Sequence, residues 1–178
     1  DMSFGINYNV TFLKNEVITV NDGVGFLQGG GFGVGQDFPS RMEAGKPIGY
    51  FFGLETNGLF QNQGEVDAHA TQPNAGPGDL RFVDQNGDGL IDSDDRVDIG
   101  NPIPDATMGL NLSFEYKNFD FGAYTFASIG NDIVRNYERN QPLVNRSIYT
   151  LDRWTGEGTS TTTPRVTTGA TANTLFSD

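Results

Sequence analysis

The stretch "TMGLNLSFEYKNFDFGAYTFASIG", residues 107–130, contains two runs in which apolar and small polar residues alternate. Side chains of a strand point alternately to its two faces, so a period of two predicts a strand over 107–116. Lys117 and Asn118 predict a two-residue hairpin turn, and a second, less regular strand follows over 119–129. The first run places these apolar side chains on one face: Met108, Leu110, Leu112, Phe114 and Tyr116.

The same alternation opens the chain at "MSFGINYNVTF" and predicts a strand at about residues 2–13. Both alternatives for these strands are all-β and antiparallel. In a soluble β-sandwich the apolar face covers a core, whereas in an outer-membrane barrel it faces lipid and the polar face lines a wet lumen. Strands of this length exceed the usual globular strand and match the about 9 to 11 residues of a membrane-spanning strand. The pattern alone leaves both folds open.

Composition limits the classes of function. The chain has 178 residues with 24 glycines and 36% hydrophobic residues, which is typical of a turn-rich β protein. Its net charge of −12 argues against nucleic-acid binding, because that requires basic side chains to neutralise phosphates. The chain has no cysteine, so disulfides, thiolate metal sites and thiol nucleophiles are excluded within it. No apolar run is long enough to predict a transmembrane helix.

Two long polar stretches connect or follow the predicted strands. Residues 14–106 separate the first two strands, and a connection of that length usually carries function or structure of its own. A further polar segment runs from about residue 131 and contains "GTSTTTPRVTTGATA" (158–172), which predicts an exposed extended loop. A two-residue turn beside very long loops is typical of outer-membrane barrels. The abrupt start and end of the chain lead us to expect a longer parent protein.

The loop "DQNGDGLIDSDD", residues 84–95, has the spacing of a calcium-binding loop. Such loops take ligands from positions 1, 3, 5, 7, 9 and 12, with glycine at position 6, which is Gly89 here. Oxygen ligands favour Ca²⁺ over softer metals, and Ile91 at position 8 is the expected apolar anchor. Strand-like and proline-containing flanks argue against a helix-loop-helix sensor, so we expect a structural ion; an ion-free acidic surface turn is the alternative. The predicted ligands are Asp84, Asn86, Asp88, the Leu90 carbonyl, Asp92 and Asp95.

The remaining chemistry-bearing residues give no catalytic prediction. His69 is the only histidine, which rules out a histidine cluster within the chain, and we expect a polar surface residue there. The glycine-rich stretch 23–36 lacks the Gly-Lys-Ser/Thr ending of a phosphate-binding loop. Paired carboxylates for hydrolysis are formally available, but most acids fall in the aspartate loop or in turns. Four aromatics could stack on sugar rings, although we expect a small local core: Tyr50, Phe51, Phe52 and Phe60.

Several motifs, in order along about nine-tenths of the chain, resemble the C-terminal part of the SusC/RagA-type TonB-dependent outer-membrane transporters of Bacteroidetes. The central block, residues 77–133, carries the most specific resemblance. The chain departs from the family pattern at Gly156-Glu157-Gly158, where a proline-containing stretch is common. The other motifs are "NYNVTFLKNEV" (7–17), "GKPIGYFFGLETNGLFQNQGEVDAHA" (45–70) and "LDRWTGEGTSTTTPRV" (151–166).

This resemblance implies a segment of a 22-stranded barrel with an N-terminal plug and a SusD-like surface lipoprotein as lid. The barrel would lie in outer-membrane lipid and import glycan or peptide fragments, driven by TonB through a plug that this chain does not contain. The turn at Lys117-Asn118 would lie in the periplasm, and residues 14–106 would be extracellular. The alternative function is a secreted, β-rich, calcium-binding module that binds carbohydrate, and a secreted hydrolase is a more distant one.

Overall fold

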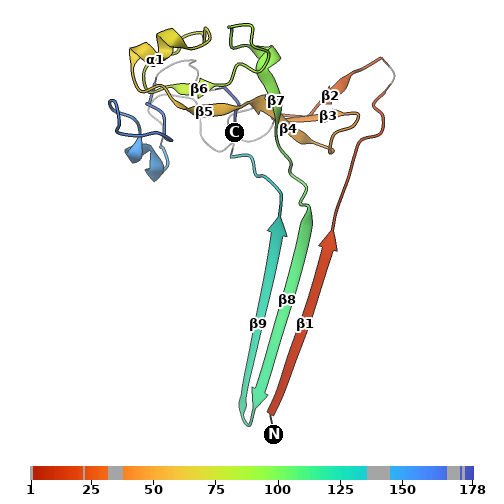
Figure 1. Ribbon diagram of the computed structural model, residues 1–178. Helices are drawn as coiled ribbons and strands as arrows, with labels where there is room; N and C mark the ends of the chain where they lie inside the picture. The colour runs from red at the N-terminus through yellow and green to blue at the C-terminus, as the bar shows by residue number, and fades with distance from the viewer. Residues whose placement is uncertain (1, 22, 32–37, 136–144, 168–172, 174) are drawn as a thin grey trace. The chain divides into compact units, whose positions relative to one another are not determined.

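The computed structural model describes residues 2–21, 23–31, 38–135, 145–167, 173 and 175–178. Its sheets are antiparallel and it contains very little helix, which confirms the expected all-β class (Figure 1). The strands are β1 (Met2–Phe12), β2 (Phe26–Gln28), β3 (Ser40–Glu43), β4 (Tyr50–Leu54), β5 (Thr56–Leu59), β6 (Leu80–Phe82), β7 (Arg96–Gly100), β8 (Ala106–Tyr116) and β9 (Phe119–Ile129). The helical elements are α1 (Gln63–Ala68) and the 3₁₀ turns η1 (Ser93–Asp95) and η2 (Ile148–Asp152).

The three longest strands form one sheet in the order β1-β8-β9 (Figure 1). Each strand has 11 residues, and the pairing is continuous: Met2 lies opposite Tyr116, and Tyr116 lies opposite Phe119. Between β8 and β9, Lys117 has a φ of 55°, in the left-handed region that glycine prefers. The turn is therefore as short as the sequence predicts, with strain at its first central residue.

The register of this sheet collects apolar side chains on one face, which we call the apolar face. Cross-strand partners share a face, so the apolar residues of β1, β8 and β9 form continuous rows, interrupted only by Thr125. The other face carries Gly, Asn, Ser and Thr, the acidic pair Glu115 and Asp120, and Tyr124 and Phe126 from β9. The two aromatics explain the less regular pattern of the third strand. The apolar face consists of Met2, Phe4, Ile6, Tyr8, Val10, Phe12, Ala106, Met108, Leu110, Leu112, Phe114, Tyr116, Phe119, Phe121, Ala123, Thr125, Ala127 and Ile129.

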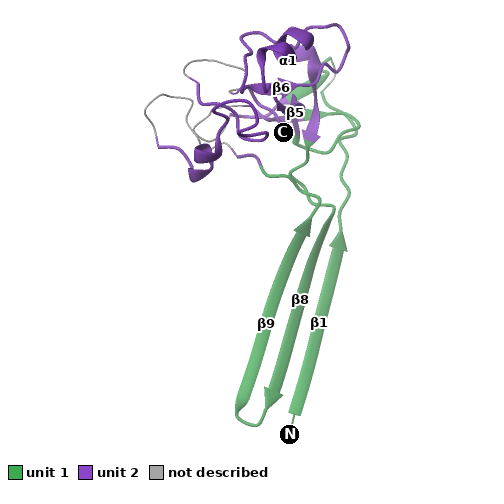
Figure 2. Ribbon diagram, turned by 60° about the vertical axis from the view of Figure 1, so that its left-hand side comes forward, with its two compact units in different colours: residues 1–27, 42–50, 100–133 green, residues 28–41, 51–99, 134–178 purple. Residues whose placement is uncertain are grey.

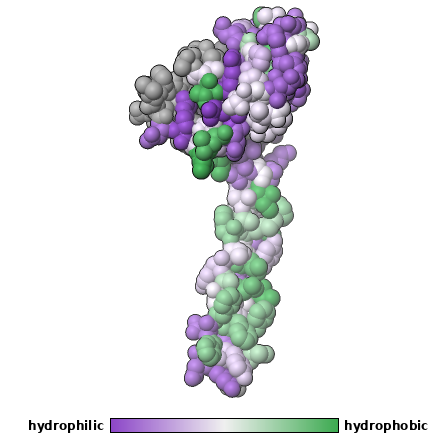
Figure 3. Space-filling model, turned by 90° about the vertical axis from the view of Figure 1, so that its left-hand side faces the viewer, coloured by the Kyte–Doolittle hydropathy of each residue, from purple (hydrophilic) through white to green (hydrophobic). Residues whose placement is uncertain are grey.

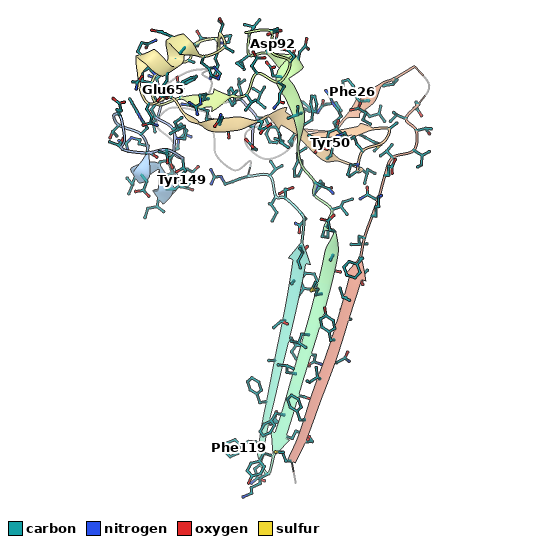
Figure 4. All side chains as sticks on the ribbon, viewed as in Figure 1. Phe26, Tyr50, Glu65, Asp92, Phe119 and Tyr149 are labelled. Atoms are coloured by element: carbon teal, nitrogen blue, oxygen red, sulfur yellow. The ribbon has the colours of Figure 1, made fainter. Side chains whose placement is uncertain are left out.

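Most of the apolar face is exposed in this chain. The side chains of Phe4 and Ile6 are each 63% exposed, and Phe12 is 77% exposed. Figure 3 shows apolar residues along much of the length of the long strands, and Figure 4 shows Phe119 at the end where β8 turns into β9. A soluble sandwich would cover such a face with a second sheet, whereas these side chains are largely exposed.

The chain divides into two compact units (Figure 2). Unit 1 comprises residues 1–27, 42–50 and 100–133 and contains the three-stranded sheet; unit 2 comprises residues 28–41, 51–99 and 134–178. Two smaller sheets have the strand orders β2-β3-β4-β7 and β5-β6. The core of unit 2 is small: Leu54, Phe82 and Ile91 are buried together, with Ala70 and Leu80 packed against them. Among the residues described, no helix has the length and apolar character needed to cross a membrane.

Candidate functional site

The acidic loop of residues 84–95 lies in unit 2 between β6 and β7, and Figure 4 labels Asp92 within it. Strands flank the loop on both sides, and its last three residues form the 3₁₀ turn η1. The loop carries five aspartates, at positions 84, 88, 92, 94 and 95. Their mutual repulsion must be offset by the contacts that the carboxylates make.

The first half of the loop folds around Asp84. The Gly87 N–H donates to its Oδ1 (2.7 Å) and the Gly89 N–H donates to its Oδ2 (2.9 Å). Both glycines have a positive φ, of 74° and 84°, a conformation in which other residues are strained. The glycines therefore let the backbone curl so that two N–H groups face one carboxylate.

Asn86 and Asp88 continue this arrangement. The Asp88 N–H donates to Asn86 Oδ1 (2.9 Å), and the Leu90 N–H donates to Asp88 Oδ1 (2.8 Å). The Asn86 side-chain amide also donates to Asp88 Oδ2 (3.0 Å). Each of these side chains thus accepts from a backbone group two residues farther along, which is the pattern of an Asx turn.

Asp95 closes the loop from the inside. Its side chain is fully buried, and it accepts from the Gln85 N–H (2.8 Å) and the Asp92 N–H (2.9 Å), with a weaker approach from the Asn86 N–H (3.5 Å). The Asp92 side chain accepts in turn from the Asp94 N–H (2.8 Å). It also accepts from the Asp95 backbone, and this bond with the reciprocal bond from the Asp92 N–H to the Asp95 side chain forms a capping box around η1. One buried carboxylate therefore ties the start of the loop to its end.

The loop is anchored on the unit 2 core through Ile91, which is 4% exposed and packs with Leu54 and Phe82. Thr71 pairs with this segment in a parallel bridge: its N–H donates to the Gly89 carbonyl (2.7 Å), and its carbonyl accepts from the Ile91 N–H (3.0 Å). The predicted apolar anchor at position 8 is thus a core residue.

The predicted calcium ligands all lie on this one loop, but their side chains are arranged around backbone donors. Within the described part of the chain, no three His, Cys, Asp or Glu side chains come together in a group suited to a metal ion. The donor set is nevertheless the kind that Ca²⁺ takes, because an ionised carboxylate oxygen that accepts one N–H keeps a free lone pair. Calcium at residues 84–95 stays a prediction.

A second polar cluster, which the sequence does not predict, surrounds Asp79 in unit 2. Asp79 is fully buried, and Arg165 binds it through two parallel hydrogen bonds: Nε to Oδ1 (2.7 Å) and Nη2 to Oδ2 (2.7 Å). The Gly76 N–H donates to Oδ2 (2.9 Å) and the Asn173 side-chain amide to Oδ1 (2.9 Å). The pKa of Arg165 is raised, chiefly by its hydrogen bond to Asp79. Residues 158–172 are expected to be an exposed loop; Arg165 within them is only partly exposed, with its side chain 36% exposed and tied to a buried carboxylate.

Backbone contacts reinforce this cluster. The Arg165 N–H donates to the Gly78 carbonyl (2.8 Å), and the Asn173 side-chain oxygen accepts from the Leu80 N–H (2.8 Å). Gly78 has a φ of 86°, and a Cβ at this position would overlap the Trp154 ring. Residues far apart in the sequence thus meet at one buried carboxylate.

The other residues singled out in the sequence have packing roles. Tyr50 and Phe60 are almost fully buried, which confirms local packing for these two aromatics, and the Arg41 guanidinium lies 3.5 Å from the centre of the Phe52 ring. His69 is half-buried, with its ring edge-on to Phe60 at 5.2 Å, so the expected surface location is only partly correct. In the glycine-rich stretch 23–36, residues 32–36 lie outside the described residues.

Comparisons with known proteins give one consistent result. No family model matches the chain. Two TonB-dependent receptors of Formosa agariphila are each 32% identical to it, over 71% and 93% of this chain, and the TonB-dependent receptor SusC of Bacteroides thetaiotaomicron is 30% identical over 83%. The matched part is only 13%, 17% and 14% of these relatives, so the chain spans a small part of their length. This similarity over most of the chain confirms the resemblance noted in its motifs: the chain belongs to the SusC-type TonB-dependent receptors.

Proposed function

We propose that this chain is part of the wall and outer loops of a TonB-dependent importer in a bacterial outer membrane. The observation that carries the proposal is the three-stranded sheet, which has one apolar and exposed face and one polar face. Soluble proteins rarely expose a contiguous apolar surface of this kind, whereas a lipid-facing barrel wall requires one. Family membership supports the same assignment.

Strand length is consistent with a bilayer. Eleven residues per strand, at about 3.4 Å per residue, give about 37 Å. A strand tilted by about 40° would then rise about 28 Å along the membrane normal, close to the about 25 Å apolar band of outer-membrane barrels. At the turn between β8 and β9, Tyr116, Phe119 and Phe121 lie on the apolar face, which is where an interfacial aromatic girdle would be expected.

The proposed orientation follows from connection length. The two-residue turn at Lys117-Asn118 is assigned to the periplasm, and residues 14–106, with the acidic loop, to the cell exterior. The complete protein is proposed to be a 22-stranded barrel with a plug that contacts TonB and a SusD-like lipoprotein over its outer mouth. Its cargo is proposed to be glycan or peptide fragments, and no catalytic step is assigned to this chain. The exposed apolar face weighs against the soluble carbohydrate-binding module.

The orientation can be tested by labelling, because this chain has no cysteine of its own. Asp67→Cys would place a thiol on exposed α1, and Asn118→Cys would place one in the short turn. In intact cells that carry the full-length protein, a membrane-impermeant maleimide is expected to label Asp67→Cys, and not Asn118→Cys, above the level of the protein without either substitution. Asn118→Cys should react only after the outer membrane is permeabilised, and equal labelling of both in intact cells would contradict the proposed topology.

We also propose that the loop of residues 84–95 binds Ca²⁺ as a structural ion. The proposed ligands are Asp84, Asn86, Asp88, the Leu90 carbonyl, Asp92 and Asp95. Support comes from the sequence spacing and from the positive φ of Gly87 and Gly89, which curls the backbone beneath the carboxylates. The ion would supply positive charge that offsets repulsion among the aspartates.

Calcium binding is tested by limited proteolysis of the full-length protein in CaCl₂ and in EGTA. Chelation is expected to increase cleavage within residues 77–105. The double variant Asp88→Asn, Asp92→Asn should be cleaved equally in both conditions, whereas Asp67→Asn, which removes a carboxylate outside the loop, should behave like the parent protein. Cleavage of the parent that does not depend on chelation would leave the acidic turn without an ion.

A further inference from the structure

Residues 154–167 of unit 2, which we call the strap, make polar contacts with the β5–β6 region. The Gly158 N–H donates to Gln61 Oε1 (3.0 Å), and Gln61 Nε2 donates to the Ser160 carbonyl (3.1 Å). The Asn62 side-chain amide donates to Glu157 Oε1 (2.8 Å). The Gly158–Gln61 and Asn62–Glu157 bonds are exposed, so water can replace them at little cost, and the Gln61–Ser160 bond is partly buried.

The strap contributes little to an apolar core. None of its residues is fully buried, and Val166 is exposed; the strap's apolar contact with the rest of unit 2 is that of the Trp154 ring, which lies against Gly78. The β5–β6 sheet, by contrast, belongs to a segment with its own core of Leu54, Phe82 and Ile91. Few buried apolar contacts and many exposed hydrogen bonds are the marks of a segment that opens at low free-energy cost. The strap is therefore held mainly by polar contacts, whereas the sheet beneath it is stabilised by an apolar core.

One contact of the strap is an ion pair, unlike the neutral hydrogen bonds described above. The ion pair of Asp79 and Arg165 joins a fully buried carboxylate to a guanidinium whose side chain is 36% exposed. The fork geometry, with both distances at 2.7 Å, is the strong form of this interaction. In the closed state Asp79 is cut off from water, and two further donors, from Gly76 and Asn173, complete its hydrogen bonds.

From these contacts we propose that the strap opens and closes as a unit over the β5–β6 sheet, and that the Asp79–Arg165 pair is its latch. In the open state the Asp79 carboxylate regains water. In the closed state it depends on Arg165 for its countercharge, since Gly76 and Asn173 donate as neutral groups. Loss of the guanidinium therefore penalises the closed state alone and shifts the equilibrium toward opening. This inference concerns unit 2 by itself and does not depend on the proposed transport function.

Hydrogen exchange of the full-length protein, followed by mass spectrometry, tests the latch. In the parent protein, peptides covering 154–167 are expected to exchange through a smaller opening than peptides covering β5 and β6. Arg165→Met keeps much of the side-chain stem and removes the charge; we expect it to speed exchange of the strap about 10- to 100-fold and to leave β5–β6 protected. The matched control is Arg81→Met, because Arg81 pairs with Glu65 at 3.9 Å with both side chains partly exposed; it should leave strap exchange unchanged.

A second variant separates the latch from general damage. Adding Asp79→Asn to Arg165→Met removes the buried charge that the single variant leaves unpaired, so strap exchange should fall back toward the parent rate. Two results would overturn the proposal: strap and β5–β6 exchanging at one common rate in the parent protein, or Arg165→Met leaving strap exchange unchanged. The first result needs no variant, so the test stands even if Arg165→Met fails to fold.

Discussion

Leu112→Arg tests whether the apolar face meets lipid. Leu112 lies near the middle of β8, opposite Ile6 on β1 and Ala123 on β9, so it is central both along the strands and across the sheet. Its neighbour Asn111 lies at the same depth and points to the other face, opposite Asn7. Substitutions at Leu112 and Asn111 therefore separate the effect of the face of the sheet from the effect of depth in the membrane.

The expected cost follows from this position. An arginine on the lipid face of an outer-membrane barrel costs about 2–4 kcal/mol at the midplane and about 0–1 kcal/mol near the interface. Leu112→Arg should therefore lower the folding equilibrium constant in bilayers by about 30- to 900-fold, since about 1.4 kcal/mol is a factor of ten. Tyr116→Arg, at the end of the strand, should cost at most about 1 kcal/mol. Asn111→Arg on the polar face should be nearly neutral.

The assay is urea-dependent folding of the full-length protein into vesicles, with the folded fraction read from heat-modifiable mobility. The three variants should rank Leu112→Arg far below Tyr116→Arg, with Asn111→Arg close to the parent. If Asn111→Arg costs as much as Leu112→Arg, the two faces are equivalent and the lipid assignment fails. If Tyr116→Arg and Leu112→Arg cost the same, the dependence on depth is absent, and the apolar face is packed against protein instead.

Three further substitutions test local features of the structure. Lys117→Gly relieves a positive φ at the β8–β9 turn and should stabilise the protein by up to about 1 kcal/mol in the same urea titration, because the strain removed exceeds the added chain entropy. Gly78→Ala combines a positive φ with overlap of the Trp154 ring, so proteolysis within 154–167 should increase, whereas Gly156→Ala, in open space, should have little effect. Asp95→Asn replaces one acceptor oxygen of a buried carboxylate that binds two backbone N–H groups at under 3 Å. It should destabilise the acidic loop by about 1–3 kcal/mol. The measurement is hydrogen exchange, which should become faster at Gln85 and Asp92.

The parts of the fold that could be read from the sequence are those governed by local periodicity. Alternation over 107–116 reflects a strand with two unlike faces, and the structure has β8 at Ala106–Tyr116. The regularity is weaker in β9 because Tyr124 and Phe126 lie on the polar face, although the strand itself is equally long. The aspartate loop could also be predicted because its pattern is local: its glycines and carboxylates lie within twelve consecutive residues.

The Asp79 cluster could not be found this way. Asp79 and Arg165 are 86 residues apart, and neither belongs to a periodic run. The motifs that contain them, residues 77–133 and 151–166, do not indicate that the two side chains meet. The only hint was compositional, in that Arg165 follows a proline within a segment otherwise rich in threonine. An ion pair with a buried carboxylate depends on tertiary placement, which periodicity does not encode, so a polar segment that contains such an arginine is predicted to be exposed.

In the acidic loop, a local sequence pattern and tertiary contacts act together. Eight backbone N–H groups donate to its carboxylates, from Gln85, Asn86, Gly87, Gly89, Leu90, Asp92, Asp94 and Asp95. These donors, with Ile91 in the core and Thr71 alongside, already fix the path of the backbone. Electrostatic repulsion between the aspartates still destabilises the loop, and a divalent cation would offset this repulsion. Chelation should accordingly loosen residues 84–95 while β6 and β7 stay folded, and in EGTA added salt should partly restore protection, because it screens exposed carboxylates.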